Sequence, residues 1–401
     1  MSFVFYDAET TGTDTAFDQI LQFGAIRTDD DLNEIDRFEI RCRLLPHVVP
    51  APMALKVTGI DPKALMDQAL PSHYEAIRQV HAKLSEWSPS VFVGFNSISF
   101  DENLLRQAFY QTLQPIYLTN TSGNTRADML RITHAVAAYA PNALAIPLGD
   151  SGKQVFKLDQ LSPTNGFDHE NAHDAMGDVE ATIHLAKLIR DRAPDVWGRM
   201  MQLSRKQNTE DILKEEEILC LTQYFGGREH NRYVTECGAD PTYDASRAVL
   251  DLKQDPEVYF EMTIGELLRE MKRSPAVIRG IRTNAQPILM PYKAAPEGLP
   301  EAYPAMEELV RRARIAATNT EFRIRVGEAL ATRYPEKEPS PHVEQQIYDG
   351  FASSGDQALM RRFHNVPWED RLGVAREMAD PRMRRIAQRL IYFERSDVLP
   401  E

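Results

Sequence analysis

The chain has 401 residues, of which 43% are hydrophobic and 26% are charged, and its formal net charge at pH 7 is −13. This length predicts two or three domains with ample hydrophobic core, and the sequence contains no apolar run long enough to span a membrane. The acidic balance excludes a uniformly basic nucleic-acid-binding surface, so binding of that kind would depend on a local cationic groove and on metal ions.

The first predicted element is a buried strand in Phe3–Gly12, where an apolar, aromatic and β-branched run is stopped by a Thr-Thr-Gly turn. Asp7 and Glu9 are two residues apart, so on a strand their side chains point to the same side. Mg²⁺ prefers oxygen ligands, and this pair would hold such cations on a rigid support. The alternative is two solvated acids at a strand end, because an isolated Asp-x-Glu match is a weak signal.

A second strand and a helix are predicted within residues 91–111. The apolar run Val91–Phe95 is followed by a polar turn, and a helix is expected over Glu102–Gln111 with Asp101 at its start. Asp101 has two interpretations. It is either a functional carboxylate or an N-cap that accepts backbone N–H bonds and suits the helix dipole.

The third acidic element is Asn171–Asp178, which leads into an amphipathic helix that continues to Leu188. Five helical residues turn through about 500°, so His173 and Asp178 would stand about 140° apart if both were helical. We therefore expect His173 to precede the helix, with Asn171 or Asp174 near its cap. The alternative is a surface histidine beside a capping aspartate.

These elements gain meaning together, because a two-metal site about 4 Å across needs several carboxylates and a base that accepts a proton near pH 7. The combination resembles the DEDDh group of 3′-to-5′ exonucleases in three motifs: Asp-x-Glu-Thr-x-Gly, Gly-x-Asn…Phe-Asp and His-x4-Asp. Within that group, the tracts Phe156–Leu161 and Asn165–Met176, and the chain beyond residue 190, look like the bacterial exodeoxyribonuclease I family. The resemblance covers nearly the whole chain.

The resemblance implies an α/β fold: a ribonuclease H-like mixed sheet flanked by helices, then a small Src-homology-3-like β-barrel with inserted helices, then a C-terminal helical segment. It implies two Mg²⁺ ions per site, with Mn²⁺ also possible. Asp7, Glu9 and Asp178 would be direct ligands, and Asp101 would bind the second metal directly or through water. His173 would act as the base toward the attacking water.

The family likeness also implies substrate contacts. Glu9 and Thr10 would hold the terminal 3′-hydroxyl, and Lys157, Arg106 and Tyr117 occupy positions that contact single-stranded DNA in the family. Arg126 is a further cationic candidate, and Tyr110 a further aromatic able to stack on bases. The residues alone also allow Arg106 to be a solvated helix face and Tyr117 to be a half-buried loop aromatic.

Beyond the nuclease the pattern changes to short strands broken by turns, which suggests a small barrel. A connecting helix is predicted at Val196–Arg205, a helix at Ile264–Met271, and strands at Leu219–Phe225, Tyr233–Cys237, Ala248–Leu252, Ala276–Ile281 and Pro287–Met290. We expect a DEDDh exonuclease domain at 1–190, a barrel domain at 195–335 and a short C-terminal helical domain at 341–401.

Two basic segments in these later domains are possible contacts for a phosphate backbone. The segment Gly226–Arg232 carries two arginines, although a hairpin turn with incidental charge is the preferred interpretation. The helical region Glu301–Tyr334 holds the densest basic stretch. For its five arginines, a strand-guiding surface and solvated helix faces remain equal alternatives. These are Arg311, Arg312, Arg314, Arg323 and Arg325.

The final helical segment, Pro341–Arg395, is shorter than the family's C-terminal domain. We therefore expect a shallower passage around DNA and lower processivity. Docking of the C-terminal tail of a single-stranded DNA-binding protein is a possible partnership, and we expect a monomer. Cys42, Cys220 and Cys237 are odd in number and widely spaced, and no basic-then-apolar leader follows Met1. This indicates a reducing cytoplasm, no zinc site and no membrane.

The predicted activity is exodeoxyribonuclease I-like: metal-dependent 3′-to-5′ hydrolysis of single-stranded DNA to 5′-mononucleotides, in DNA repair or recombination. Two alternatives stay open. A DEDDh exonuclease that acts on RNA, or as a proofreader, would share the five catalytic residues, although such enzymes are usually little longer than the first 190 residues. A non-catalytic nucleic-acid-binding module is less consistent, because binding alone does not need clustered carboxylates that repel phosphate.

Overall fold

The computed structural model describes residues 2–168, 174–334 and 338–400. They form two compact units that interleave along the sequence. Unit 1 comprises Met1–Thr125, His169–Ile183 and Lys337–Glu401, and unit 2 comprises Arg126–Asp168 and His184–Glu336. The chain therefore returns to the first unit at its C-terminal end.

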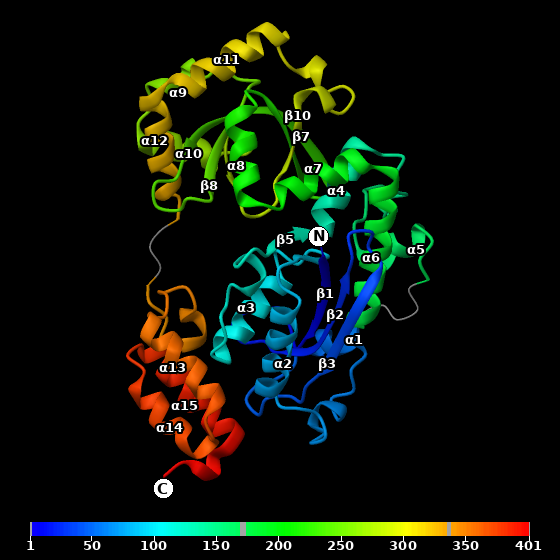
Figure 1. Ribbon diagram of the computed structural model, residues 1–401. Helices are drawn as coiled ribbons and strands as arrows, with labels where there is room; N and C mark the ends of the chain where they lie inside the picture. The colour runs from blue at the N-terminus through cyan, green and yellow to red at the C-terminus, as the bar shows by residue number, and fades with distance from the viewer. Residues whose placement is uncertain (1, 169–173, 335–337, 401) are drawn as a thin grey trace. The chain divides into compact units, whose positions relative to one another are not determined.

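A five-stranded mixed sheet in the order β3-β2-β1-β4-β5 positions the acidic residues (Figure 1). The central strand β1 pairs antiparallel with β2 and parallel with β4. Both of its faces are covered, so most of its side chains are buried. The strands are β1 (Phe3–Thr10), β2 (Ile20–Thr28), β3 (Glu34–Arg41), β4 (Val91–Gly94) and β5 (Thr125–Asp128).

Helices α2 and α3 pack against this sheet and share its hydrophobic core. A capping box starts α2, because Ser72 accepts the Glu75 N–H while the Glu75 carboxylate accepts the Ser72 N–H. The buried face of α3 includes Leu104, Leu105 and Phe109. The helices before residue 125 are α1 (Pro52–Thr58), α2 (His73–Glu86) and α3 (Asp101–Gln111), and α6 (Ala175–Arg192) begins in unit 1.

The C-terminal helices share a hydrophobic cluster with the N-terminal part of unit 1. Tyr74 and Tyr110 are buried in this cluster together with Phe363. Arg371 lies 3.7 Å from the ring centroid of Trp368 and donates from Nη1 to the Tyr74 hydroxyl at 2.8 Å. The helices are α13 (Ser354–Asn365), α14 (Trp368–Glu377) and α15 (Pro381–Arg395).

Unit 2 is built on a second five-stranded sheet, in the order β10-β6-β7-β8-β9, in which each neighbouring pair of strands is antiparallel. Its strands are β6 (Leu219–Phe225), β7 (Arg228–Ala239), β8 (Ser246–Asp251), β9 (Ile278–Arg282) and β10 (Ile288–Pro291). The helices are α4 (Met129–Tyr139), α5 (Leu158–Thr164), α7 (Pro194–Leu203), α8 (Lys206–Glu215), α9 (Glu257–Phe260), α10 (Ile264–Lys272), α11 (Met306–Thr318) and α12 (Thr320–Ala331).

The elements of unit 2 follow the predicted pattern. The predicted strand Leu219–Phe225 matches β6, and the predicted helix Ile264–Met271 matches α10 to within one residue. The described helical region after Glu301 is divided in two at Asn319, whose side chain accepts the Phe322 N–H at 3.0 Å and caps α12. The mixed α/β fold class is confirmed.

Cys42, Cys220 and Cys237 are buried free thiols. Among the described helices, none combines the length and the apolar character that a membrane crossing requires.

Candidate active site

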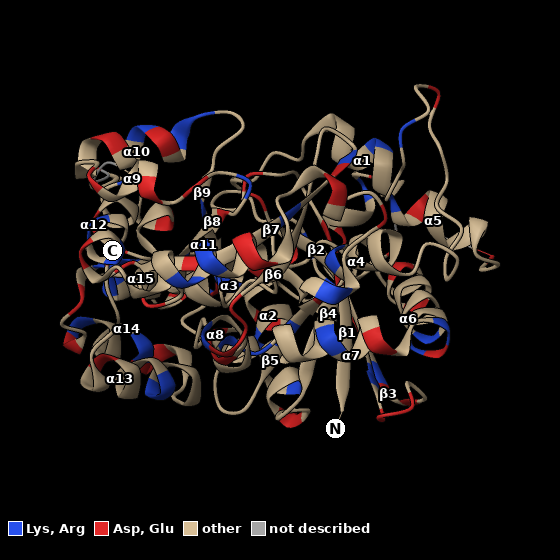
Figure 2. Ribbon diagram, turned by 90° about the horizontal axis from the view of Figure 1, so that it is seen from above, with Lys and Arg blue, Asp and Glu red and all other residues tan. Residues whose placement is uncertain are grey.

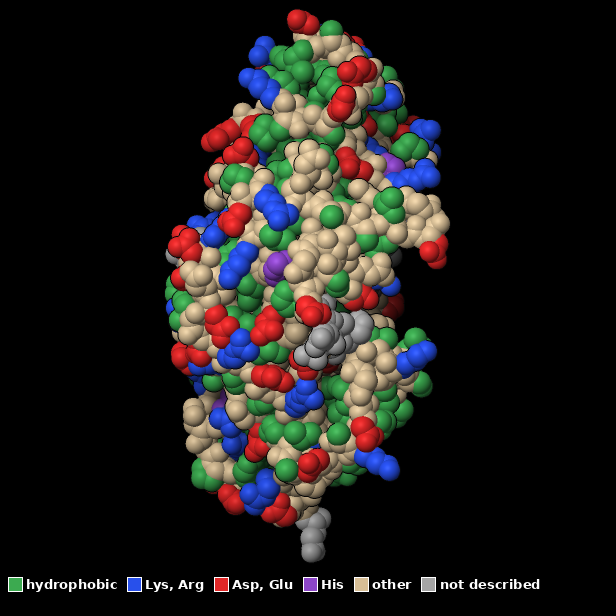
Figure 3. Space-filling model, turned by 90° about the vertical axis from the view of Figure 1, so that its right-hand side faces the viewer, with side chains coloured by type: hydrophobic (Ala, Val, Ile, Leu, Met, Phe, Trp, Pro, Cys, Tyr) green, Lys and Arg blue, Asp and Glu red, His purple; other side chains and the backbone are tan. Residues whose placement is uncertain are grey.

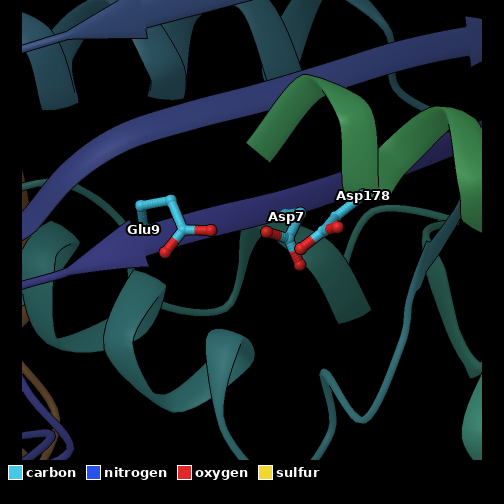
Figure 4. Close-up of side chains that lie close together, drawn as sticks. All are labelled: Asp7, Glu9 and Asp178. Carbon is cyan, nitrogen blue, oxygen red and sulfur yellow. The ribbon is translucent and has the colours of Figure 1, made fainter. Parts of the chain in front are cut away.

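Three carboxylates converge at the end of the central strand. Asp7 and Glu9 project from β1 and Asp178 reaches toward them from the first turn of α6 (Figure 4). One ligand oxygen from each residue lies within 4.8 Å of the other two. An all-oxygen donor set that carries three negative charges suits a hard divalent cation, so the residues fit a metal of this class.

Asp174 fixes the start of α6 and thereby the position of Asp178. Its Oδ1 accepts the Met176 N–H at 3.2 Å and the Gly177 N–H at 3.4 Å, which is the geometry of a helix cap. Its Oδ2 accepts from Gln22 Nε2 at 2.9 Å and from Arg41 Nη2 at 2.6 Å. Of the two predicted capping candidates, Asp174 is therefore confirmed, and it is tied to the sheet.

Gly24 allows the helix to come this close. It pairs directly with Asp7 across β1 and β2, and a Cβ atom at Gly24 would lie 3.0 Å from backbone atoms of both Ala175 and Met176. A larger residue would push the start of α6 away from the strand that carries Asp7. Sequence reasoning missed Gly24, although a glycine inside an apolar strand is a signal of close backbone approach.

Asp101 is the first residue of α3, and the N-cap position belongs to Phe100. The N-cap interpretation of Asp101 is therefore wrong. The residue is only 6% exposed and lies outside the group of three close carboxylates. Its charge nevertheless raises the pKa of both Asp7 and Glu9, which places Asp101 in the same electrostatic environment.

His173, the predicted base, lies outside the described residues, which resume at Asp174.

Thr10, a predicted substrate contact, is 8% exposed, and its Oγ1 donates to the Gly12 carbonyl at 2.7 Å. The Ala51 N–H donates to the Thr11 carbonyl at 2.7 Å, so the segment before α1 is attached to this turn. The turn that follows Glu9 is therefore held by bonds to its own backbone.

Without a cation, ionising the carboxyl groups of this site costs free energy, because their negative charges lie close together. Burial raises the pKa of Asp7 well above its usual range, and the charges of Asp101, Asp178 and Glu9 raise it further. Burial, followed by the charges of Asp178 and Asp101, raises the pKa of Glu9 to about 8. A cation would offset this repulsion, and both carboxyl groups would then release their protons.

This electrostatic arrangement predicts that the effect of pH on stability differs with and without metal. The ordinary pKa of Glu9, 4.5, is raised to about 8 by folding, so the folded metal-free protein holds the extra proton between these values. Its stability should consequently fall as pH rises from about 5 to 8 in chelator. Excess Mg²⁺ should remove this decline, because the cation binds the ionised form. Thermal unfolding at pH 5.5–8.5, in chelator and in Mg²⁺, measures both.

Glu9→Gln is the matched control for this prediction, because it removes the titrating group at nearly constant volume. The variant should show a flatter dependence of unfolding temperature on pH in chelator than the unmodified protein. An identical pH dependence with and without Mg²⁺ in the unmodified protein would contradict the assignment of these carboxylates to a cation site.

Comparisons with known proteins agree on one family. A family model described as an exonuclease matches residues 4–186. Exodeoxyribonuclease I of Haemophilus influenzae is 30% identical over 389 residues, which cover 92% of this chain and 81% of that protein. The chain belongs to the exodeoxyribonuclease I family. The predicted family and the predicted enzyme class are confirmed.

Solved exonuclease I structures extend the agreement to the fold. The crystal structure of Escherichia coli exonuclease I in complex with a dA16 oligonucleotide has a TM-score of 0.88 at 25% identity, and the match covers 100% of this chain and 88% of that one. A crystal structure described as SSB/exonuclease I in complex with the inhibitor CFAM has a TM-score of 0.84 at 24% identity, covering 100% and 87% of the two chains.

Arg106 and Tyr117, two predicted DNA contacts of this exodeoxyribonuclease I family member, are in contact with each other. The Arg106 guanidinium carbon lies 5.0 Å from the ring centroid of Tyr117, and its Nε donates to Glu102 Oε1 at 2.9 Å. The Arg106 side chain is 14% exposed, so the solvated-helix interpretation is wrong for it. Tyr117 is half-buried.

The three other residues predicted to contact DNA are Tyr110, Arg126 and Lys157. Tyr110 is 3% exposed and donates to the Val343 carbonyl at 2.9 Å, so the expectation that it stacks on bases is wrong. Arg126 donates from Nη2 to the Asn284 carbonyl at 3.2 Å within unit 2. Lys157 is exposed and immediately precedes α5, also in unit 2.

The five arginines of α11 and α12 are largely neutralised by neighbouring acids, and α11 itself carries both acidic and basic residues (Figure 2). Arg311 pairs with Asp255 at 2.6 Å, and Arg323 pairs with Glu236 at 2.7 Å. Arg312, Arg314 and Arg325 pair with Glu308, Glu217 and Glu321 respectively. These ion pairs weigh against a free strand-guiding surface and show that the region is not simply a solvated basic face.

The predicted hairpin at Gly226–Arg232 is present, with Gly226 at φ 60° and Gly227 at φ 72° in the turn between β6 and β7. These positive φ values suit glycine.

On the face drawn in Figure 3, basic and acidic side chains are interspersed. The cationic contacts of this family member are therefore to be sought in individual arginines.

Proposed function

We propose that this protein removes mononucleotides stepwise from the 3′ end of single-stranded DNA, releasing 5′-mononucleotides, with Mg²⁺ as its working cation. The observation that carries the proposal is the convergence of Asp7, Glu9 and Asp178 within 4.8 Å in a chain of the exodeoxyribonuclease I family. The complex of the Escherichia coli relative with a dA16 oligonucleotide supports the choice of substrate.

We assign a separate role in the reaction to each group of side chains. Asp7, Glu9 and Asp178 would hold the cation, and Asp101 would hold a second cation directly or through water. When bound, such cations activate water and stabilise charge on the phosphate and the leaving oxygen. His173 would accept the proton of the attacking water, and Glu9 and Thr10 would orient the terminal 3′-hydroxyl. The all-oxygen donor set also accommodates Mn²⁺.

DNA binding would involve Arg106 and Tyr117 as one unit. The ion pair with buried Glu102 holds the arginine in place, and the arginine in turn lies over the tyrosine ring. The Arg106 guanidinium would pair with a phosphate, and the Tyr117 ring would stack on a base. Because both side chains are already held in place, binding would cost little side-chain entropy. Exposed Lys157 would supply a further phosphate contact.

The sequence domains 1–190, 195–335 and 341–401 remain our functional division. In that division the nuclease contains the carboxylates and the last domain packs on it through the cluster around Tyr74. We further propose a monomer that acts in cytoplasmic DNA repair or recombination. Interaction with the tail of a single-stranded DNA-binding protein is also proposed, by analogy with the SSB/exonuclease I structure.

The substrate assignment is tested with 5′-labelled oligonucleotides of one sequence, as single-stranded DNA, duplex DNA and single-stranded RNA. Single-stranded DNA should shorten from its 3′ end one nucleotide at a time in Mg²⁺, while duplex DNA and RNA shorten more slowly. Chelator should stop the reaction. The RNA arm tests the 2′-hydroxyl as the discriminating group.

Asp178→Asn provides the control, because any shortening that persists in this variant comes from a contaminating nuclease. Faster loss of RNA than of DNA would favour the alternative RNA exonuclease. Binding of single-stranded DNA without hydrolysis in Mg²⁺ or Mn²⁺ would favour the non-catalytic binding module.

A further inference from the structure

Two arginines and one aspartate occupy neighbouring positions on one face of the unit 2 sheet. Arg232 is on β7, Asp251 on β8 and Arg279 on β9, and these strands are adjacent in that order. Val234 pairs with Asp251, and Val249 pairs with Arg279. Directly paired residues share a face, as do residues two apart on one strand. All three charged side chains therefore project from the same face.

The single carboxylate is already engaged by other groups. Asp251 Oδ1 accepts from the Tyr303 hydroxyl at 2.7 Å and from the Lys253 N–H at 3.0 Å. Asp251 Oδ2 lies 3.5 Å from Arg232 Nε, which is a long ion pair between side chains that are 14% and 13% exposed. The carboxylate thus neutralises one guanidinium at most, and the row keeps one net positive charge.

Arg279 has no ion pair or hydrogen bond with any residue that the structure describes, and its buried Nε has no partner. Arg232 Nη1 is likewise buried without a partner. Burial, followed by the charge of Arg232, lowers the pKa of Arg279. The two guanidinium groups thus have hydrogen-bond donors that no described protein acceptor satisfies.

Two neighbouring arginines, Arg247 and Arg323, have close carboxylate partners, whereas Arg325 Nε on α12 is also buried without a partner. Arg247, on β8, pairs with Glu210 at 3.1 Å, and Arg323 pairs with Glu236 at 2.7 Å. An unsatisfied buried donor lowers the stability of the fold, and more so when the group is charged. An anion at this row would offset its net positive charge, because guanidinium groups bind phosphate oxygens with charge-assisted hydrogen bonds.

We propose that Arg232 and Arg279 form a phosphate-binding subsite on this sheet, which takes a backbone phosphate of the single-stranded DNA that the enzyme degrades. The inference rests on the proposed function for the identity of the strand. A single phosphodiester would neutralise the net charge of the row and would accept from the guanidinium of Arg279, whose side chain is only partly buried. Free phosphate and the mononucleotide product offer the same chemistry, and the experiment separates these sources.

The test measures binding of a fluorescent oligothymidylate to the full-length protein in chelator, over a series of KCl concentrations. Arg279→Gln should weaken binding about fivefold and make the slope of log K against log salt shallower by about 0.7, as expected for one lost phosphate contact on a single strand. Arg273→Gln is the matched control, since Arg273 is 69% exposed and already paired with Glu270. It should bind like the unmodified protein.

A stability measurement distinguishes this role from a structural one. Because Arg279 is partly buried without a partner, Arg279→Gln should raise the unfolding temperature of the ligand-free protein or leave it unchanged. A lower unfolding temperature together with unchanged DNA binding would overturn the proposal and make Arg279 a structural residue.

The source of the phosphate is decided by parallel titrations of inorganic phosphate and thymidine 5′-monophosphate, read as thermal stabilisation. One result would overturn the assignment to the DNA strand and make the free anion the ligand. In it, phosphate or the mononucleotide stabilises the unmodified protein but not Arg279→Gln, while Arg279→Gln binds DNA normally. If no ligand distinguishes Arg279→Gln from the unmodified protein, no phosphate subsite exists. Failure of the unmodified protein to bind or cut single-stranded DNA would instead refute the proposed function, and the free-phosphate titrations would still test the subsite.

Discussion

Asp7→Asn is expected to abolish hydrolysis of single-stranded DNA while making the metal-free protein more stable. The carboxylate is one of three close cation ligands, so its loss should lower the rate by roughly three orders of magnitude or more. The same change removes a buried charge that Asp101, Asp178 and Glu9 repel. Stability in chelator at pH 8 should rise by about 1–2 kcal/mol.

Three measurements on one variant check this expectation: the rate of DNA shortening, Mn²⁺ affinity by calorimetry and the unfolding temperature in chelator. Asp31→Asn, a change of the same charge at an exposed position, should alter none of them. Near-normal hydrolysis by Asp7→Asn would show that the site has been misplaced. Weaker stability in chelator would show that Asp7 is held by favourable interactions instead of repulsion.

His173→Ala should also abolish hydrolysis, but through a different step. A general base contributes about 10²–10⁴-fold to rate, so the rate at pH 7 should fall within this range while Mn²⁺ affinity stays unchanged. The unmodified enzyme should lose rate at acidic pH as the imidazole is protonated, and the variant should have a flatter profile in that range. Rates at pH 5.5–8.5 with saturating metal supply the comparison.

Exposed His342 offers the control, because His342→Ala removes an imidazole from another part of unit 1. That variant should keep both the rate and the pH profile of the unmodified enzyme. If His173→Ala bound Mn²⁺ much more weakly, the histidine would have to be reassigned from base to metal ligand.

Local rules predicted part of the convergence of the acids, and the combination of motifs and the family resemblance implied the rest. Strand alternation places Asp7 and Glu9 on one side, and helix geometry places Asp178 after the cap. The restraints that complete the site are long-range. Gly24 acts through its register with Asp7 and its contact with Ala175, which are not encoded in any short window.

The basic residues show the opposite limitation of sequence reasoning. Arg311 and Arg323 look alike in a charge-rich helical region, yet each meets acids from distant segments, Asp255 and Glu236. Arg279 attracts no attention in the sequence and is the arginine without a partner among the described residues of its sheet row. Local composition does not determine which charges are neutralised, because the neutralising acids come from other elements.

The shared cluster around Tyr74 has a consequence for biosynthesis. Tyr74 and Arg371 are in contact although they are 297 residues apart in sequence. Contacts at such separation form late, because a long loop must close first. During translation, the face of the nuclease formed by Tyr74 and Tyr110 would stay exposed until the C-terminal helices leave the ribosome. The emerging chain would therefore depend on protection from aggregation until its last helices are made.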